Sequence, residues 1–232
     1  MAGARGVLTR MAAVRPATAP AEFPPPGFVT KLYPSCTATH AAVAELIALG
    51  SQAAGRAAAP PQAIRCGLDA FVPRILIPGL PDGPDAARFS LGYCLAYAAL
   101  YGALGPEAFA PQAFAAGAPA DPAIRDLMGR ITIETDASLP KGPSGIATGA
   151  SVTLIRDDGT VLSGRREAVP GSRQSPPCDA DLQRKFAVCL APVCDREAAG
   201  DLWRRLSSLS EFSSAGALLD ALPAAFTLLG QD

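Results

Sequence analysis

The feature that most restricts the fold is a pair of alternating segments on either side of a turn, within residues 151–165. Apolar and polar residues alternate from Val152 to Leu154, and the alternation resumes after the turn from Val161 to Ser163. The intervening Asp157-Asp158-Gly159-Thr160 contains Asp-Gly, one of the strongest short-range signals for a β-hairpin. An antiparallel hairpin is expected here, which excludes a purely helical fold.

Helices are expected on both sides of this hairpin, because apolar residues recur there every three or four positions. Asp121 and Pro122 suit the N-cap and first position of one helix, and Gly102 suits the end of another. The sequence therefore predicts an α+β fold, a small antiparallel sheet packed by several helices. The expected helices are His40–Leu49, Asp85–Tyr101, Asp121–Met128, Asp179–Leu190, Arg196–Leu206 and Ala215–Leu222, and the further strands are Ala63–Phe71 and Ile131–Thr135.

Residues 1–27 differ in composition from the rest of the chain. They are rich in alanine and proline and end in Pro-Pro-Pro-Gly, which predicts a disordered tail or linker before one domain over residues 28–232. The formal net charge of −1 gives no reason to expect a nucleic-acid partner. The longest uncharged apolar stretch, Leu91–Leu104, is shorter than the roughly 20 residues of a membrane span, so no membrane association is expected.

The chain has six cysteines and one histidine, with no C-x-x-C pair. This spacing does not favour a zinc site, and no metal is expected. Cys94 and Cys189 fall within apolar helical patterns, where buried thiols are common. We expect a reducing, cytoplasmic environment without a disulfide framework.

Four segments, taken in order, resemble the MmgE/PrpD family. They are K-L-Y-P-S-C-T-A-T-H at 31–40, A-R-F-S-L-G-Y-C at 87–94, D-P-A-I-R-D-L-M at 121–128, and the hairpin followed by L-Q-R-K-F at 182–186. The resemblance covers only the C-terminal α+β domain of that family. It implies that the reaction also needs a helical N-terminal domain, expected on another chain or lost by truncation, and that the isolated chain is inactive.

The family's activities set the expected function. Its members dehydrate 2-methylcitrate, decarboxylate cis-aconitate or epimerise related acids, so the resemblance implies a small polycarboxylate substrate. It also implies a lyase without metal or other cofactor, and a homodimer.

Three residues are expected to be catalytic by resemblance. Lys31 matches a lysine that binds a substrate carboxylate, although a solvated loop lysine would look the same. Tyr93 matches a tyrosine that contributes to the site, and its alternative is a place in the apolar face of a helix. His40 could serve as acid or base, or could hold the start of its helix.

Three further residues are expected to bind substrate. Arg88 could bind a carboxylate through two hydrogen bonds or could pair with Asp85, and Ser90 follows it in the same segment. Cys36 stands where the itaconate-forming members have a histidine, which argues against decarboxylation and leans toward dehydration.

Two other functions stay open. A non-catalytic remnant would serve as a binding or oligomerisation module, and would expose the apolar surface that once met its partner. A thiol-dependent enzyme would need a base near one cysteine, and no cysteine lies beside the histidine in sequence.

Overall fold

The computed structural model describes residues 28–52, 60–208, 214 and 216. The expected tail, residues 1–27, lies outside this part of the chain. So does the expected helix Ala215–Leu222, apart from Gly216.

A four-stranded sheet in the order β4-β1-β5-β6 forms one layer of the molecule. Its strands are β1 (Ala63–Leu68), β4 (Ile131–Thr135), β5 (Ala150–Ile155) and β6 (Val161–Arg166). The expected hairpin is β5 and β6, and Gly159 adopts a positive φ of 80° in its turn. The fold class α+β is confirmed. One pairing is parallel rather than antiparallel, because β1 reaches β4 through a helical crossover.

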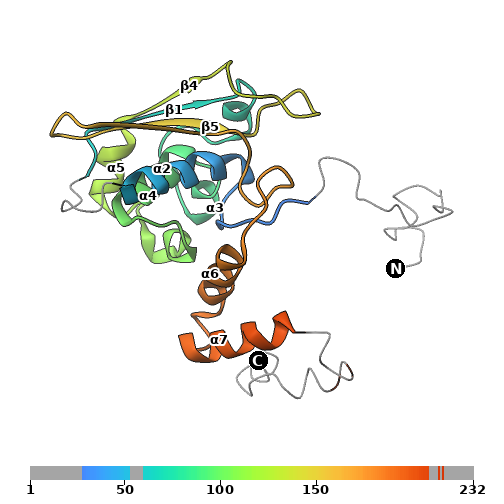
Figure 1. The fold of residues 1–232 in the computed structure, drawn as a ribbon. Helices are drawn as coiled ribbons and strands as arrows, with labels where there is room; N and C mark the ends of the chain where they lie inside the picture. The colour runs from blue at the N-terminus through green and yellow to red at the C-terminus, as the bar shows by residue number, and fades with distance from the viewer. Residues whose placement is uncertain (1–27, 53–59, 209–213, 215, 217–232) are drawn as a thin grey trace, which may run out of the picture.

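Helices α2 (His40–Gln52), α4 (Leu91–Tyr101) and α5 (Pro122–Met128) cover one face of the sheet, below it in Figure 1. Alternate residues of the strands face these helices, so Ile64, Cys66 and Leu68 of β1 and Val152 of β5 are almost fully buried. Short elements connect them: η1 (Thr37–Thr39), η2 (Val72–Ile75), α3 (Pro84–Ala87), η3 (Pro106–Phe109), η4 (Pro111–Ala113), and the pair β2 (Phe114–Ala115) and β3 (Ala118–Pro119).

The expected helix Asp85–Tyr101 is wrong as one element, because it is two helices, α3 and α4, separated at Arg88–Ser90. The side chain of Ser90 accepts a hydrogen bond from the backbone N–H of Tyr93 and so caps α4. Phe89 consequently lies in the break, 45% exposed, instead of on the apolar face. The helix ends as expected, with Gly102 in the left-handed conformation at φ 70°.

Three smaller expectations also change. Helix α2 runs through Gly50 to Gln52. Strand β1 ends at Leu68, because the carboxylate of Asp69 turns the chain by accepting from the N–H of Phe71. Cys189 is exposed, whereas Cys94 is buried as expected and burial raises the pKa of its thiol to about 12.

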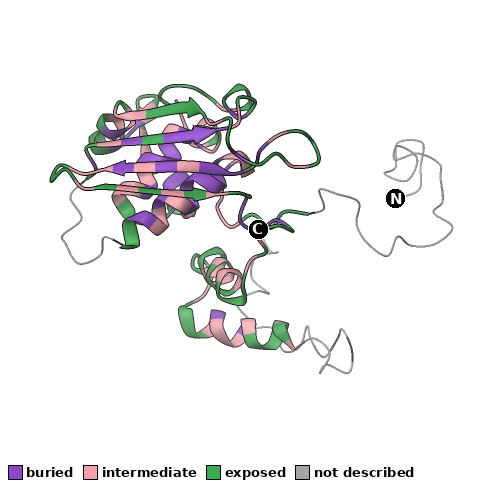
Figure 2. Cartoon of the chain, turned by 45° about the horizontal axis from the view of Figure 1, so that its top comes forward, coloured by how far each residue is buried: buried purple, intermediate pink, exposed green. Residues whose placement is uncertain are grey.

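Helices α6 (Asp179–Leu190) and α7 (Arg196–Ser207) extend away from the sheet and its helices in Figure 1. They pack on each other through Phe186 and Trp203, whose ring centroids are 5.5 Å apart. None of the α6 residues is buried, as the pink and green colours of Figure 2 show. This helix pair therefore adds little to the core.

The cap on α4 gives a stability prediction. Replacing Ser90 with alanine removes the acceptor for the N–H of Tyr93, and we expect the free energy of unfolding to fall by about 1 kcal/mol. Urea unfolding measures it. Ser51→Ala, on an exposed helix end, is the matched control, and an equal change in both variants would contradict the assignment of Ser90 as the cap.

Candidate functional site

Two hydrogen bonds join the segment 31–40 to the break between α3 and α4. The N–H of Cys36 donates to the carbonyl of Arg88 at 2.8 Å, and Nη1 of Arg88 donates to the carbonyl of Pro34 at 3.1 Å. The guanidinium also lies 3.8 Å from the carboxylate of Asp85 and 5.1 Å above the ring of Phe109. Two segments singled out in the sequence thus lie together, with Arg88 held by protein groups.

His40 is completely buried at the start of α2. Its Nε2 lies 3.4 Å from the carbonyl oxygen of Ser35, and its ring meets the ring of Tyr33 edge-on at 5.2 Å. Its Nδ1 is buried without a hydrogen-bond partner in the described structure. Burial lowers the pKa of His40 to about 4, helped by the positive charges of Lys31 and Lys185 and opposed by backbone hydrogen bonds. The imidazole is therefore neutral at pH 7.

Ser90 and Tyr93 also face the interior. The Tyr93 ring lies among Tyr97, Phe109 and Phe114, and its hydroxyl donates to the carbonyl of Ala108. Burial raises the pKa of this phenol. Tyr93 thus contacts protein groups of the core, whereas Ser90 caps α4 and borders a second cavity of about 390 Å³ on the far side of that cap.

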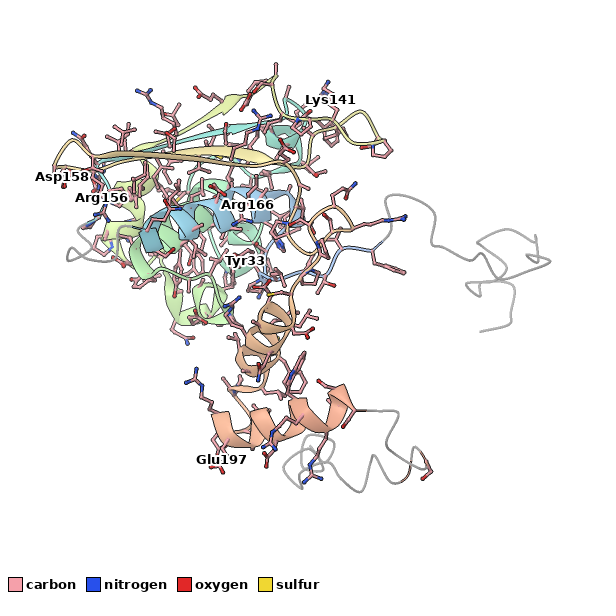
Figure 3. All side chains as sticks on the ribbon, in the orientation of Figure 1. Tyr33, Lys141, Arg156, Asp158, Arg166 and Glu197 are labelled. Carbon is pink, nitrogen blue, oxygen red and sulfur yellow. The ribbon has the colours of Figure 1, made fainter. Side chains whose placement is uncertain are left out.

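A cavity of about 550 Å³ lies between the segment 32–34, α2, the loop 102–107 and α6. Its charged residues are three cations and two acids, namely Arg166, Arg184, Lys185, Glu107 and Asp181. They come from three separate parts of the chain, so only the fold brings them together. Figure 3 labels Tyr33 and Arg166 on this side of the sheet.

Two of the three cations already have an acidic partner. Nε of Arg166 lies 3.1 Å from the carboxylate of Glu45 on α2, and Arg184 pairs with Asp181 within α6. The ammonium of Lys185 lies 4.0 Å from Sγ of Cys189, and no ion pair holds it among the described residues. Lys185 is thus the cation of this cavity most available to an anionic ligand.

Tyr33 is a candidate that the sequence did not single out. It lines the cavity, half-buried, and its hydroxyl has no hydrogen-bond partner within the described ranges. Burial raises the pKa of Tyr33, while the charges of Arg166 and Arg184 lower it by a smaller amount. Its phenol is protonated at neutral pH and can donate a hydrogen bond or a proton.

The sequence did carry a signal for these residues. Tyr33 stands within the segment 31–40, and Arg184 and Lys185 stand within the segment 182–186. Each was noted for its resemblance to a family segment, but nothing in the sequence indicated that the two segments share a cavity.

Lys31 and Cys36 both belong to the segment 31–40. Lys31 is exposed, and its charge reaches the imidazole of His40, as that of Lys185 does. Cys36 is partly buried. None of the six cysteines forms a disulfide. Lys31 and Lys185 therefore both place positive charge near His40.

Neither a metal cluster nor a membrane-spanning helix is found in the part of the chain that the structure describes. No group of three or more His, Cys, Asp or Glu side chains there could hold a metal ion. No described helix has the length and apolar character needed to cross a bilayer.

A family model matches most of the chain. A model of the MmgE/PrpD C-terminal domain matches residues 33–206, which include α6, nearly all of α7 and all of the cavity lining except Leu32. Lys31 lies two residues before the matched range. No curated protein matches the chain.

The buried histidine gives a pH prediction. Below pH 6.5 the unfolded chain binds a proton at His40 that the folded chain does not, so stability falls as the pH drops from 6.5 to about 4. Relative to His40→Gln, the native chain should lose about 3 kcal/mol of unfolding free energy over this window.

Urea unfolding at a series of pH values measures this difference. Asp69, Asp136 and Asp181 have pKa values lowered by hydrogen bonds, so their contribution falls mainly below pH 4 and is common to both proteins. Parallel pH profiles for the two proteins would show that His40 titrates normally and is not buried.

Proposed function

Because the chain belongs to the MmgE/PrpD family through its C-terminal domain, we propose that it acts on small di- or tricarboxylic acids. The reaction is a dehydration, of the kind that 2-methylcitrate dehydratase carries out. The observation that carries the proposal is the cavity beside the segment 31–40, where Arg166, Arg184 and Lys185 meet the phenol of Tyr33. Such a lining suits a ligand with several carboxylates.

The roles follow from the charges that a dehydration develops. Removing a proton next to a carboxylate builds negative charge on its oxygens, and Lys185 with Arg184 stabilises that charge. The leaving hydroxyl needs a proton, which the protonated phenol of Tyr33 supplies. Lys31 binds a second carboxylate from the exposed edge of the site.

Glu107 is the carboxylate of this cavity that can accept the proton, because Asp181 is paired with Arg184 and no ion pair of Glu107 is found among the described residues. His40 is neutral but buried and does not line the cavity. A helical domain closes the site, as the family resemblance implies. The exposed apolar side chain of Val188 on α6, 40% exposed, supports such a partner.

A non-catalytic binding module is the second candidate. The observation that favours it is the inward placement of three residues expected at the site, because His40, Ser90 and Tyr93 are each at most 1% exposed. In this case the cavity binds a polycarboxylate without turning it over. A cytoplasmic location and a homodimer stay predictions under either candidate.

Turnover and binding separate the two candidates. The purified chain is mixed with 2-methylcitrate, citrate or cis-aconitate, and NMR follows product while calorimetry follows binding. Product from the chain, alone or with a helical-domain partner, supports the dehydratase. Binding without product under both conditions supports the module, and absence of both would contradict the polycarboxylate proposal.

The three lysines of the chain provide matched variants. Lys185→Ala removes a cation from the cavity, and Lys31→Ala removes one from its edge. Each should weaken polycarboxylate binding about tenfold, as expected for the loss of one charged hydrogen bond.

Lys141→Ala is the control, because Lys141 does not line this cavity, although it and Arg166 both border a neighbouring one. Its affinity should equal that of the parent chain. Equal losses in all three variants would indicate a non-specific effect of net charge and would contradict the cavity as the binding site.

A further inference from the structure

Arg166, labelled in Figure 3, has a buried hydrogen-bond donor with no acceptor. It lies at the end of β6 opposite Ala150 and therefore on the side of the sheet that the helices cover. Its Nε is buried without a hydrogen-bond partner in the described structure, although the side chain as a whole is 33% exposed. Buried polar groups almost always have such a partner, so this arginine calls for an explanation.

Glu45 on α2 is the acidic partner of this guanidinium. Its Oε2 lies 3.1 Å from Nε of Arg166, and its side chain is only 12% exposed. The contact is a charge pair rather than an aligned hydrogen bond, because Nε has no hydrogen-bond partner. Glu45 thus fixes the inner side of the guanidinium, and the two Nη groups at its far end stay available to a ligand.

Gly164 gives the carboxylate of Glu45 the room it needs. A Cβ placed on Gly164 would overlap Oε1 of Glu45 and lie 2.9 Å from its Cδ. Gly164 stands two positions before Arg166 and so on the same face of β6. The carboxylate therefore rests against the strand backbone at Gly164, and from there it reaches Arg166.

We propose that Glu45 is a positioning residue, which uses the room at Gly164 to hold Arg166 ready to bind one carboxylate of the ligand. The inference rests on the proposed function, because that ligand is the polycarboxylate of the 550 Å³ cavity, which Arg166 lines. The terminal N–H groups of an arginine can bind a carboxylate through two parallel hydrogen bonds. Arg166 does so from β6, while Arg184 and Lys185 face the ligand from α6. Holding the guanidinium in advance reduces the ordering that binding requires.

Calorimetry with citrate and citramalate, which lacks one of its carboxylates, tests the positioning. The parent should prefer citrate about tenfold, and Arg166→Gln should abolish this preference. Gly164→Ala keeps both charges but displaces the carboxylate of Glu45, so the preference should fall at least about threefold, as in Glu45→Gln. Gly50→Ala is the control, since a Cβ there meets nothing within 4 Å. An unchanged preference in Gly164→Ala, or tighter citrate binding by Glu45→Gln as simple charge neutralisation would give, would overturn the proposal.

NMR of the ligand-free chain tests the positioning without relying on the proposed function. The buried Nε–H of Arg166 should give a slowly exchanging signal, identified by its absence from Arg166→Gln. It should exchange at least about tenfold faster in Glu45→Gln and Gly164→Ala than in the parent and Gly50→Ala. Equal exchange in all four proteins, each shown to be folded by circular dichroism, would overturn the proposal. A slow signal in a parent that binds neither acid would contradict the proposed function alone.

Discussion

The pair of hydrogen bonds between the segment 34–36 and Arg88 is the constraint on which the site depends. It holds an irregular stretch of chain against the break between α3 and α4, and so fixes where α2 begins. Tyr33 precedes this tether and is thereby directed into the cavity, while His40 follows it and is directed into the core. Loss of the Arg88 guanidinium would therefore alter both the cavity and the core.

The same arrangement keeps the charged side chains at the cavity and leaves His40 and Tyr93 buried in the core. The cations of the cavity come from β6 and α6, and the core beneath it contains a neutral imidazole and a buried phenol. Because burial disfavours charged forms, His40 and Tyr93 are kept neutral at physiological pH. Anion binding at the surface of the cavity thus does not require a compensating change in the core.

Elements defined by local chemistry could be predicted from the sequence. The hairpin follows from alternation and an Asp-Gly turn, and α5 follows from Asp121, which caps it by accepting from the N–H of Ala123 at 2.8 Å. The break at Ser90 was missed, because an apolar periodicity of 3.6 continues across a capping residue. The parallel β1–β4 pair depends on contacts about 67 positions apart, as in Ile64 with Ile131, for which a single sequence carries no signal.

The candidate site was also predicted only in part from the sequence. Lys31, Cys36 and Arg88 were found from their resemblance to family segments, and the structure brings the last two into contact. The meeting of the segments 31–40 and 182–186 could not be predicted, since the loop 167–178 and the exposed helix pair decide it. Three of the residues expected at the site do not line this cavity: His40 and Tyr93 contact the core, and Ser90 caps α4, because residue type alone does not show which way a side chain points.

Chemical-shift mapping of the isotope-labelled chain with citrate tests the central claim most directly. A ligand that binds in the cavity should shift the amide signals of Tyr33, Arg166, Arg184 and Lys185 together and saturably, with those around Lys141 unchanged. Shifts that are absent, or that centre on residues outside this cavity, would contradict the account of the site as a receptor for small polycarboxylates.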